Sequence, residues 1–228
     1  MINLNLLLDA IYFLAVAGIS LAIYLRTQDV FRLSKHPGLF HFRNIFLYFS
    51  LAYLIRFLYT SYVLNYGFRM MRHTLGPTLL SFILVGYLST LAVLSIAMTV
   101  MIRNIRMDGH DLNMLMHLTA IAFTVFALIT LSLELLVLFQ LLLFIVPIVY
   151  VYSQNPKKRK SGYLNRVTYV SLFMFWLLNL FDYGRGLIPL IINIVLYTVS
   201  VIIFLSIYLR VEKRLKNAEK KKQTRDNT

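Results

Sequence analysis

The chain has 228 residues, of which 59% are apolar and 14% charged, and its mean hydropathy is +0.72. Soluble domains are roughly 45–50% apolar, and the excess here lies in long uncharged runs that are typical of transmembrane segments. The net charge of +14 sits in short loops and one tail, without a nucleic-acid-binding module, so it predicts membrane topology and no nucleic-acid partner. Cysteine is absent, which excludes disulfides, thiolate metal sites and lipidation on cysteine.

The apolar runs predict the architecture. The first begins near Leu4 and is too long, and too poor in flanking charge, for a cleaved signal peptide. Because a hydrocarbon core of ~30 Å needs ~20 apolar helical residues, residues 1–210 are predicted to form an all-α membrane domain and residues 211–228 a basic cytosolic tail. The domain is a bundle of seven transmembrane helices near residues 4–25, 44–64, 77–102, 112–131, 133–153, 163–182 and 187–209.

The boundary between the fourth and fifth spans depends on one turn. Residues 112–153 form an almost unbroken apolar stretch, which as a single helix would be ~63 Å long, about twice the thickness of the membrane core. The stretch must therefore turn, and we expect the turn at residues 130–134. Ser132 would cap the next helix, with Glu134 in its first turn.

The basic residues predict the orientation. If the N-terminus is outside, the inner loops and the tail carry 19 lysines and arginines, whereas the outer loops carry only three, Arg69, Arg72 and Arg185. Positively charged residues gather on the cytoplasmic side of membrane proteins. The sequence therefore predicts an outer N-terminus and a cytosolic C-terminus, and we expect a multi-pass protein of a prokaryotic plasma membrane.

Two cytosolic segments are expected to contact the bilayer surface. Residues 27–36 alternate apolar and basic side chains before Pro37-Gly38, which predicts a short amphipathic piece along the inner interface. The tail is expected to continue the last helix to Leu215 and then to lose structure. Anionic lipid is the first expected partner, and a cytosolic protein the alternative. The lysines and arginine proposed for these contacts are Lys157, Lys158, Arg159, Lys160, Lys220, Lys221 and Lys222.

Strongly polar residues within the spans gather in the outer half of the predicted membrane. Asp9 and Arg56 lie at similar depths in the first two spans, so we expect them to pair, since ionisable groups at membrane depth usually face a partner or a cavity. Tyr12 shares a helix face with Asp9, and Tyr53 shares one with Arg56. The predicted cluster, for ligand binding or buried polar contact, comprises Asn5, Asp9, Tyr12, Tyr53, Arg56, Tyr59, Glu134, Gln140, Asn179, Asp182 and Asn193.

This cluster has two interpretations. Its members could simply tie helices together through buried hydrogen bonds, as polar residues do in many membrane bundles. Alternatively, they could line an outward-open cavity that holds a small ligand or ion. Loss of either partner of a buried charge pair destabilises the fold in both cases, so stability alone does not separate them.

No recognisable catalytic set occurs, so we expect no enzyme activity. The metalloprotease, nucleophile-elbow and nucleotide-binding motifs are absent, and no lysine within a span could attach retinal. His110 and His117 share a helix face, but capping or interfacial roles are commoner than haem or metal ligation, so we expect no cofactor and no metal. An internal repeat of three helices is weakly supported, since Pro147 has no counterpart in the first span.

The sequence thus predicts a non-enzymatic seven-helix membrane protein, either a receptor-like sensor or a scaffold, with an outward-facing polar pocket. In helix count and sidedness alone, the layout is similar to the seven-helix N-terminal modules of prokaryotic sensory kinases. Here a lysine-rich tail stands where those proteins continue into an output domain, so a signal would pass to a separate partner. The alternative is a small secondary transporter or channel that uses the region of Asp9 and Arg56 as its pathway.

Overall fold

The structure is a computed structural model of the chain that describes residues 4–34, 37–71, 75–101, 109–130, 132–153, 166–182 and 190–226. These residues form an all-helical fold without strands in the described ranges. The helices, in chain order, are α1 (Leu4–Ser34), α2 (Pro37–Met71), α3 (Leu75–Met101), α4 (Gly109–Thr130), α5 (Leu133–Ser153), α6 (Arg166–Asp182) and α7 (Leu190–Asp226).

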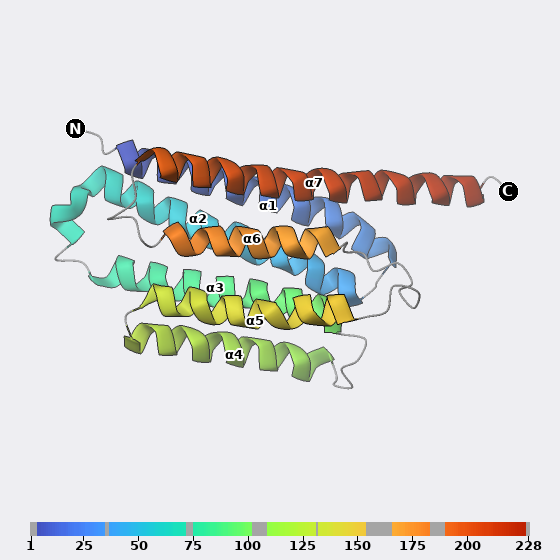
Figure 1. Cartoon of the computed structure of the whole chain (residues 1–228), viewed down its shortest axis with the longest axis horizontal. Coiled ribbons are helices and arrows are strands. Elements are labelled where there is room, and N and C mark those ends of the chain that lie inside the picture. Colours follow the sequence, from blue (N-terminus) through green and yellow to red (C-terminus); the bar gives the residue numbers. More distant parts are fainter. Residues whose placement is uncertain are drawn as a thin grey trace.

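Six of the helices close into a ring. Each of α1, α2, α3, α5, α6 and α7 packs against the next in that order, and α7 returns to α1. Helix α4 lies outside the ring, against α3 and α5 (Figure 1). Successive helices run in opposite directions, so α1 and α7 begin at the same end of the bundle and run parallel to each other (Figure 1). Residues far apart in the sequence, at the starts of α1 and α7, therefore become neighbours.

Length and composition indicate an integral, multi-pass membrane protein. Five helical segments are long and apolar enough to cross a bilayer: Leu4–Asp29, Gly38–Asn65, Gly76–Met101, Gly109–Thr130 and Leu190–Lys213. The apolar parts of α5 and α6 are shorter, at Leu135–Tyr150 and Val167–Leu178. Large apolar side chains also lie exposed in stripes on the outer faces of the helices, which suits contact with lipid rather than water. On α1 this stripe is Leu4, Leu7, Ile11, Leu14, Leu21 and Leu25.

The turn between the fourth and fifth predicted spans lies where the sequence predicted it. Helix α4 ends at Thr130, and α5 begins at Leu133. The backbone N–H of Leu135 donates to the Ser132 side-chain oxygen at 3.2 Å, which is the contact of an N-cap residue with the third residue of its helix. Ser132 therefore caps α5, and the long apolar stretch becomes two antiparallel helices.

Two helices are longer than expected. Helix α1 continues unbroken to Ser34, so residues 27–34 extend the first span instead of forming a separate amphipathic piece. Buried Thr27 donates its hydroxyl to the Ile23 carbonyl within the same helix, which satisfies this polar side chain locally. Helix α7 runs to Asp226, so the segment expected to lose structure after Leu215 is helical and projects past the other helices (Figure 1).

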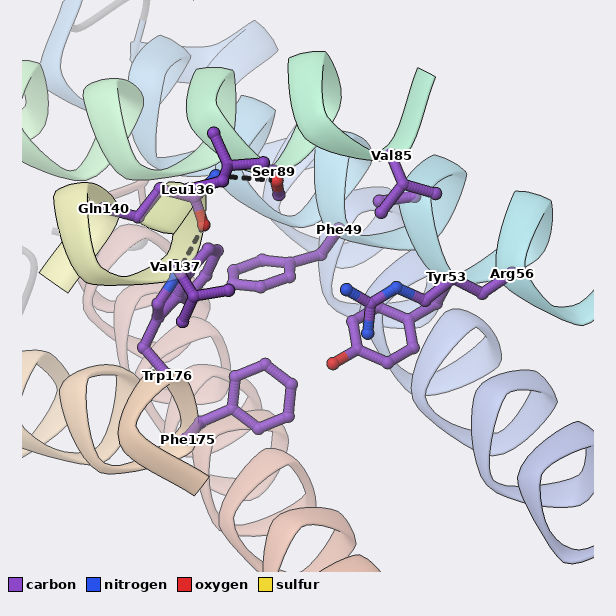
Figure 2. Close-up of a pocket in the computed structure, with 11 residues that line it drawn as sticks. Phe49, Tyr53, Arg56, Val85, Ser89, Leu136, Val137, Gln140, Phe175 and Trp176 are labelled. Atoms are coloured by element: carbon purple, nitrogen blue, oxygen red, sulfur yellow. Dashed lines mark hydrogen bonds between the residues drawn. The ribbon is translucent and has the colours of Figure 1, made fainter. Parts of the chain in front are cut away.

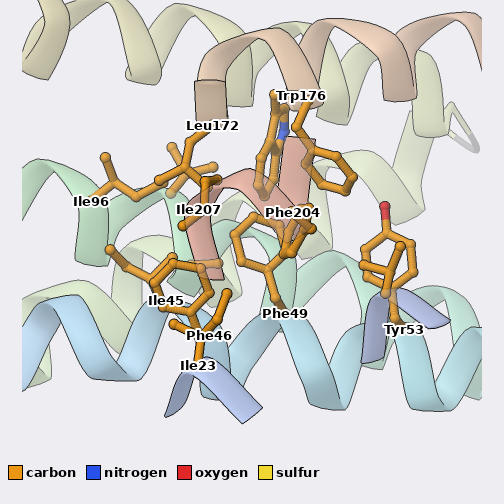
Figure 3. Close-up of a cluster of buried hydrophobic side chains, with 14 of the residues drawn as sticks. Ile23, Ile45, Phe46, Phe49, Tyr53, Ile96, Leu172, Trp176, Phe204 and Ile207 are labelled. Carbon is orange, nitrogen blue, oxygen red and sulfur yellow. The ribbon is translucent and has the colours of Figure 1, made fainter. Parts of the chain in front are cut away.

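Aromatic side chains fill the middle of the ring. Phe46 and Phe49 of α2 meet Phe204 of α7 with ring centroids 6.5 and 5.5 Å apart, and Phe204 lies 4.5 Å from Phe175 of α6. These four rings are at most 1% exposed (Figure 3). Edge-to-face packing of this kind holds large rings in fixed positions. The centre of the bundle is therefore a packed core.

Candidate functional site

A polar seam joins the starts of α1 and α7. The Tyr197 hydroxyl on α7 donates to the Asp9 carboxylate on α1 at 2.6 Å. Asp9 is 6% exposed, so its carboxylate is withdrawn from the lipid. Beside this bond, the rings of Tyr12 and Tyr197 stack with centroids 4.2 Å apart and planes 7° from parallel. A hydrogen bond to a charged acceptor is stronger than a neutral one, so this seam ties α7 firmly to α1.

Aromatic rings connect the seam to Arg56. Tyr12 meets Tyr53 edge to face at 5.9 Å, and Tyr53 lies next to Phe13 at 5.8 Å. The Arg56 guanidinium carbon is 5.1 Å from the Tyr53 ring centroid and 5.8 Å from that of Phe13. These are cation–π distances. Asp9 and Arg56 thus belong to one cluster, whereas a direct contact between them stays a prediction.

Arg56 points into a cavity between α2, α3, α5 and α6 (Figure 2). With the open solvent at its mouth, the hollow encloses about 420 Å³, whereas only about 20 Å³ is available to the centres of water molecules. One ordered water needs roughly 10–15 Å³ on that measure, so the inner part has room for one or two water molecules. The lining residues are Phe49, Ala52, Tyr53, Arg56, Val85, Ser89, Leu136, Val137, Gln140, Phe175 and Trp176.

Gln140 forms a hydrogen-bonded hub at the wall of this cavity. Its amide nitrogen donates to the hydroxyls of Ser89 at 2.8 Å and Thr90 at 2.9 Å, both on α3. Its amide oxygen accepts from the Trp176 indole N–H on α6 at 2.9 Å (Figure 2). Both hydroxyls in turn donate to the Gly86 carbonyl. Three helices are therefore joined through one side chain that is 2% exposed.

The remaining predicted residues fall into different groups. The Tyr59 hydroxyl lies 3.3 Å from that of Thr78 on α3. Asn5 is exposed on the first turns of α1, one turn before Asp9, and Asn193 lies one turn before Tyr197 on α7. The side chains of Glu134, Asn179, Asp182 and of Lys220, Lys221 and Lys222 lie outside the described residues, as do Lys157, Lys158, Arg159 and Lys160 altogether.

Sequence reasoning missed several residues that build the site. Tyr197 and Trp176 supply hydrogen-bond donors to Asp9 and Gln140. A signal for Tyr197 was present, since it follows Asn193 by four residues and so shares its helix face. Trp176 is the single tryptophan of the chain, and a buried indole N–H needs an acceptor. Polar residues in three other helices could supply one, so its partner was not predictable.

The histidine singled out by sequence lies at a different place. His117 of α4 is within 2.6 Å of the Tyr87 hydroxyl on α3 through Nδ1, and their rings stack at 6.0 Å. This contact attaches the peripheral helix α4 to the ring. In the described ranges, no group of three or more His, Cys, Asp or Glu side chains is arranged to hold a metal ion.

Comparison with known proteins finds a relative of similar length. The chain is 28% identical over 215 residues to an uncharacterised protein of Archaeoglobus fulgidus, and the match covers 91% of this chain and 92% of the relative. No protein-family profile and no solved structure matches the chain. The likeness extends over nearly the whole bundle, so the relative is similar in overall extent as well as in sequence.

Proposed function

We propose that this protein is a receptor-like membrane sensor whose seven helices all cross the bilayer, with the N-terminus outside and the C-terminal helix in the cytosol. A small ligand would enter from the outer side and bind in the cavity beside Arg56. The proposal includes no catalytic step. It rests on one observation: the same helix that bonds Asp9 through Tyr197 continues without a break to Asp226.

Helix α7 is one continuous helix that links the seam to the far end of the bundle. Its 37 residues correspond to ~55 Å at the helical rise, which exceeds the ~30 Å hydrocarbon core. Near its start, Tyr197 contacts Asp9 and Tyr12, and its far part projects beyond the bundle (Figure 1). A change at the seam would move or rotate this helix as a unit, since helix shifts of ~1–2 Å are a common switching motion.

The packed aromatic core favours sensing over transport. Phe49 and Phe175, which line the cavity, and Phe204, which packs against both, fill the ring and are at most 1% exposed. A transport pathway needs polar, water-accessible surface on both sides of its site. The transporter or channel alternative therefore requires this cluster to open, which gives it a distinct experimental outcome.

Orientation and span number can be tested by thiol labelling, because the native chain contains no cysteine. We expect a cysteine at Asn5 to react with a membrane-impermeant maleimide in intact cells. A cysteine at Lys216, whose side chain is 67% exposed, should react only after the membrane is opened. Cysteines in the outer and inner loops between the other helices extend the test to all seven spans. Labelling of both ends from the same side would contradict the proposed topology.

The sensor proposal predicts that breaking the seam moves the inner end of α7. Spin labels at Asp29→Cys on α1 and Lys216→Cys on α7 would report the distance between these helices in lipid nanodiscs. Tyr197→Phe removes the hydroxyl that bonds Asp9 and keeps the stacked ring, so we expect the distance distribution to shift or broaden on the scale of ~1–2 Å. The pulsed electron resonance measurement needs no knowledge of the ligand.

Thr198→Val is the matched control for this experiment. Thr198 is exposed and adjacent to Tyr197, and its hydroxyl bonds only the Ile194 carbonyl of its own helix among the described contacts. The distance should stay unchanged in this variant. An unchanged distance in Tyr197→Phe as well would favour the scaffold interpretation. Reaction of a Phe204→Cys variant with water-soluble thiol reagents would instead favour transport.

A further inference from the structure

An aromatic cage surrounds Arg43 at the end of the bundle opposite the polar seam. The guanidinium carbon of Arg43 lies 4.7 Å from the ring centroid of Phe31, and 5.4 Å from those of Tyr24 and Phe40. Phe31 and Tyr24 belong to α1, whereas Phe40 and Arg43 belong to α2. Three rings around one guanidinium restrict its orientation. Arg43 is thus held between the two helices, and the surface that it shares with these three rings is called the groove below.

The caged guanidinium has unused donor capacity. Its Nε atom is buried and has no hydrogen-bond partner among the described residues. A guanidinium carries five N–H donors in a planar fork that matches a phosphate or carboxylate, and a buried donor without a partner is costly. Arg43 is half-buried as a residue, so one edge of it stays accessible from outside the bundle. An anion reaching that edge would gain a fixed, charged donor.

Further positive charge surrounds this groove. Arg32, near the end of α1, is exposed one residue after the cage member Phe31. Arg26 is exposed on the same helix, close enough to Glu212 of α7 to interact with it electrostatically. The Glu212 carboxylate is itself bonded to Lys216 at 2.9 Å. With exposed Asp29 counted beside Glu212, four basic residues stand against two acidic ones, so this end of the bundle carries a net positive charge.

Exposed apolar stripes lead from the groove into the membrane. On α2, exposed Leu51 and Leu54 continue along the face that begins at Arg43, at helical spacings. On α1, Leu21 is exposed one turn from the cage member Tyr24. A guanidinium group at the end of a row of exposed leucines suits a lipid with an anionic headgroup and apolar chains. Basic pockets between helices at the cytoplasmic side are known to bind phospholipid headgroups.

We propose that this groove binds one anionic phospholipid of the inner leaflet. Arg43 bonds the phosphate, Arg32 adds charge at the rim, and the acyl chains lie along the leucines of α1 and α2. A single bound headgroup differs from the diffuse attraction that lysine-rich segments exert on anionic lipid. The groove lies ~20 Å along α2 from Arg56, so it needs no ligand in the cavity there, and only the choice of the inner leaflet rests on the proposed orientation.

Native mass spectrometry of the full chain, purified in detergent, tests the site. We expect the protein to retain one phosphatidylglycerol in preference to phosphatidylcholine when both are supplied at equal concentration. Arg43→Gln should lower this retention about fivefold, the scale expected for one basic residue near the surface. Arg43→Lys should also lower it, because lysine keeps the charge and lacks the planar fork. Arg32→Gln, at an exposed position, should lower retention without affecting folding.

Arg210→Gln is the control for charge alone, since Arg210 is exposed on α7, a helix that contributes no residue to the cage. It should change retention less than twofold. Equal losses in Arg210→Gln and Arg43→Gln would overturn the site in favour of diffuse attraction. Inorganic phosphate is the competing ligand in a second experiment. If phosphate displaces the lipid and raises the melting temperature as much as phosphatidylglycerol does, the groove is a free-anion site and the lipid proposal fails.

Discussion

Replacing Gln140 with leucine is expected to lower the free energy of unfolding by about 3 kcal/mol. The variant loses two hydrogen bonds to α3 and one to α6. Such bonds between membrane helices average ~0.6 kcal/mol each. The larger part of the cost comes from the Trp176 indole N–H, which would be left buried without its acceptor at ~1–3 kcal/mol. Reversible unfolding in mixed detergent micelles, or steric trapping in lipid, measures the difference.

A double-mutant cycle identifies the source of this loss. Trp176→Phe removes the indole donor. We therefore expect it to lower the free energy of unfolding less in the Gln140→Leu variant, where the acceptor is already gone, than in the native chain. We expect a coupling of ~1–2 kcal/mol between the two positions, in the range found for residues in one hydrogen-bond network. Strictly additive effects would mean that the indole bond contributes nothing, and would contradict the hub. Ser89→Ala should have a small effect, since Thr90 remains to accept from Gln140.

Gly86→Leu is expected to lower the free energy of unfolding by about 1–2 kcal/mol. A Cβ at Gly86 would lie 3.1 Å from the Leu136 Cδ2 of α5 and 3.4 Å from the Thr124 Cγ2 of α4. The rest of a leucine side chain has no space there, and overpacking of a filled core costs ~1–3 kcal/mol, occasionally more. The gain in helix propensity, ~1 kcal/mol, opposes this cost without cancelling it. The unfolding methods described for Gln140 apply here as well.

Gly18→Leu provides the matched control. Gly18 lies on the exposed face of α1, and a Cβ built there meets nothing within 4 Å. The same substitution should therefore be neutral, or stabilising by ~0.5–1 kcal/mol through backbone entropy. Equal losses of unfolding free energy in Gly86→Leu and Gly18→Leu would contradict the role of Gly86 in the close packing of α3, α4 and α5. A difference of about 2 kcal/mol between the two variants is the expected result.

These two positions also bear on function. The hub at Gln140 and the close packing at Gly86 fix the wall of the cavity, whereas the opposite side is formed by Tyr53 and Arg56 of α2. A rigid wall facing a charged side chain is a suitable arrangement for holding a small ligand, because preorganised groups bind without an ordering cost. In the sensor proposal, ligand binding beside Arg56 would act on α7 through the rings of Tyr53 and Tyr12.

Much of the local structure was predictable from the sequence. The capped turn at Ser132 followed from the length of the apolar stretch, since no single helix could span twice the membrane. The shared face of Asp9 and Tyr12 followed from helical periodicity, and both side chains are buried. The boundaries at which structure and expectation differ lie at polar helix ends. There, hydrophobicity no longer marks the continuing helix, and Thr27 satisfies its own hydroxyl inside α1.

The sequence by itself therefore determined the all-helical, membrane-embedded character of the chain, because bilayer thickness converts directly into runs of apolar residues. From the sequence it also followed that the strongly polar residues of the spans gather in the outer half of the predicted membrane. Only the tertiary structure decided which of them meet. Tyr197 reaches Asp9 across 188 positions of sequence because α1 and α7 run parallel and adjacent, and Gln140 selects Trp176 because α5 packs on α6. Those pairings depend on the order of helices around the ring, which local periodicity does not encode.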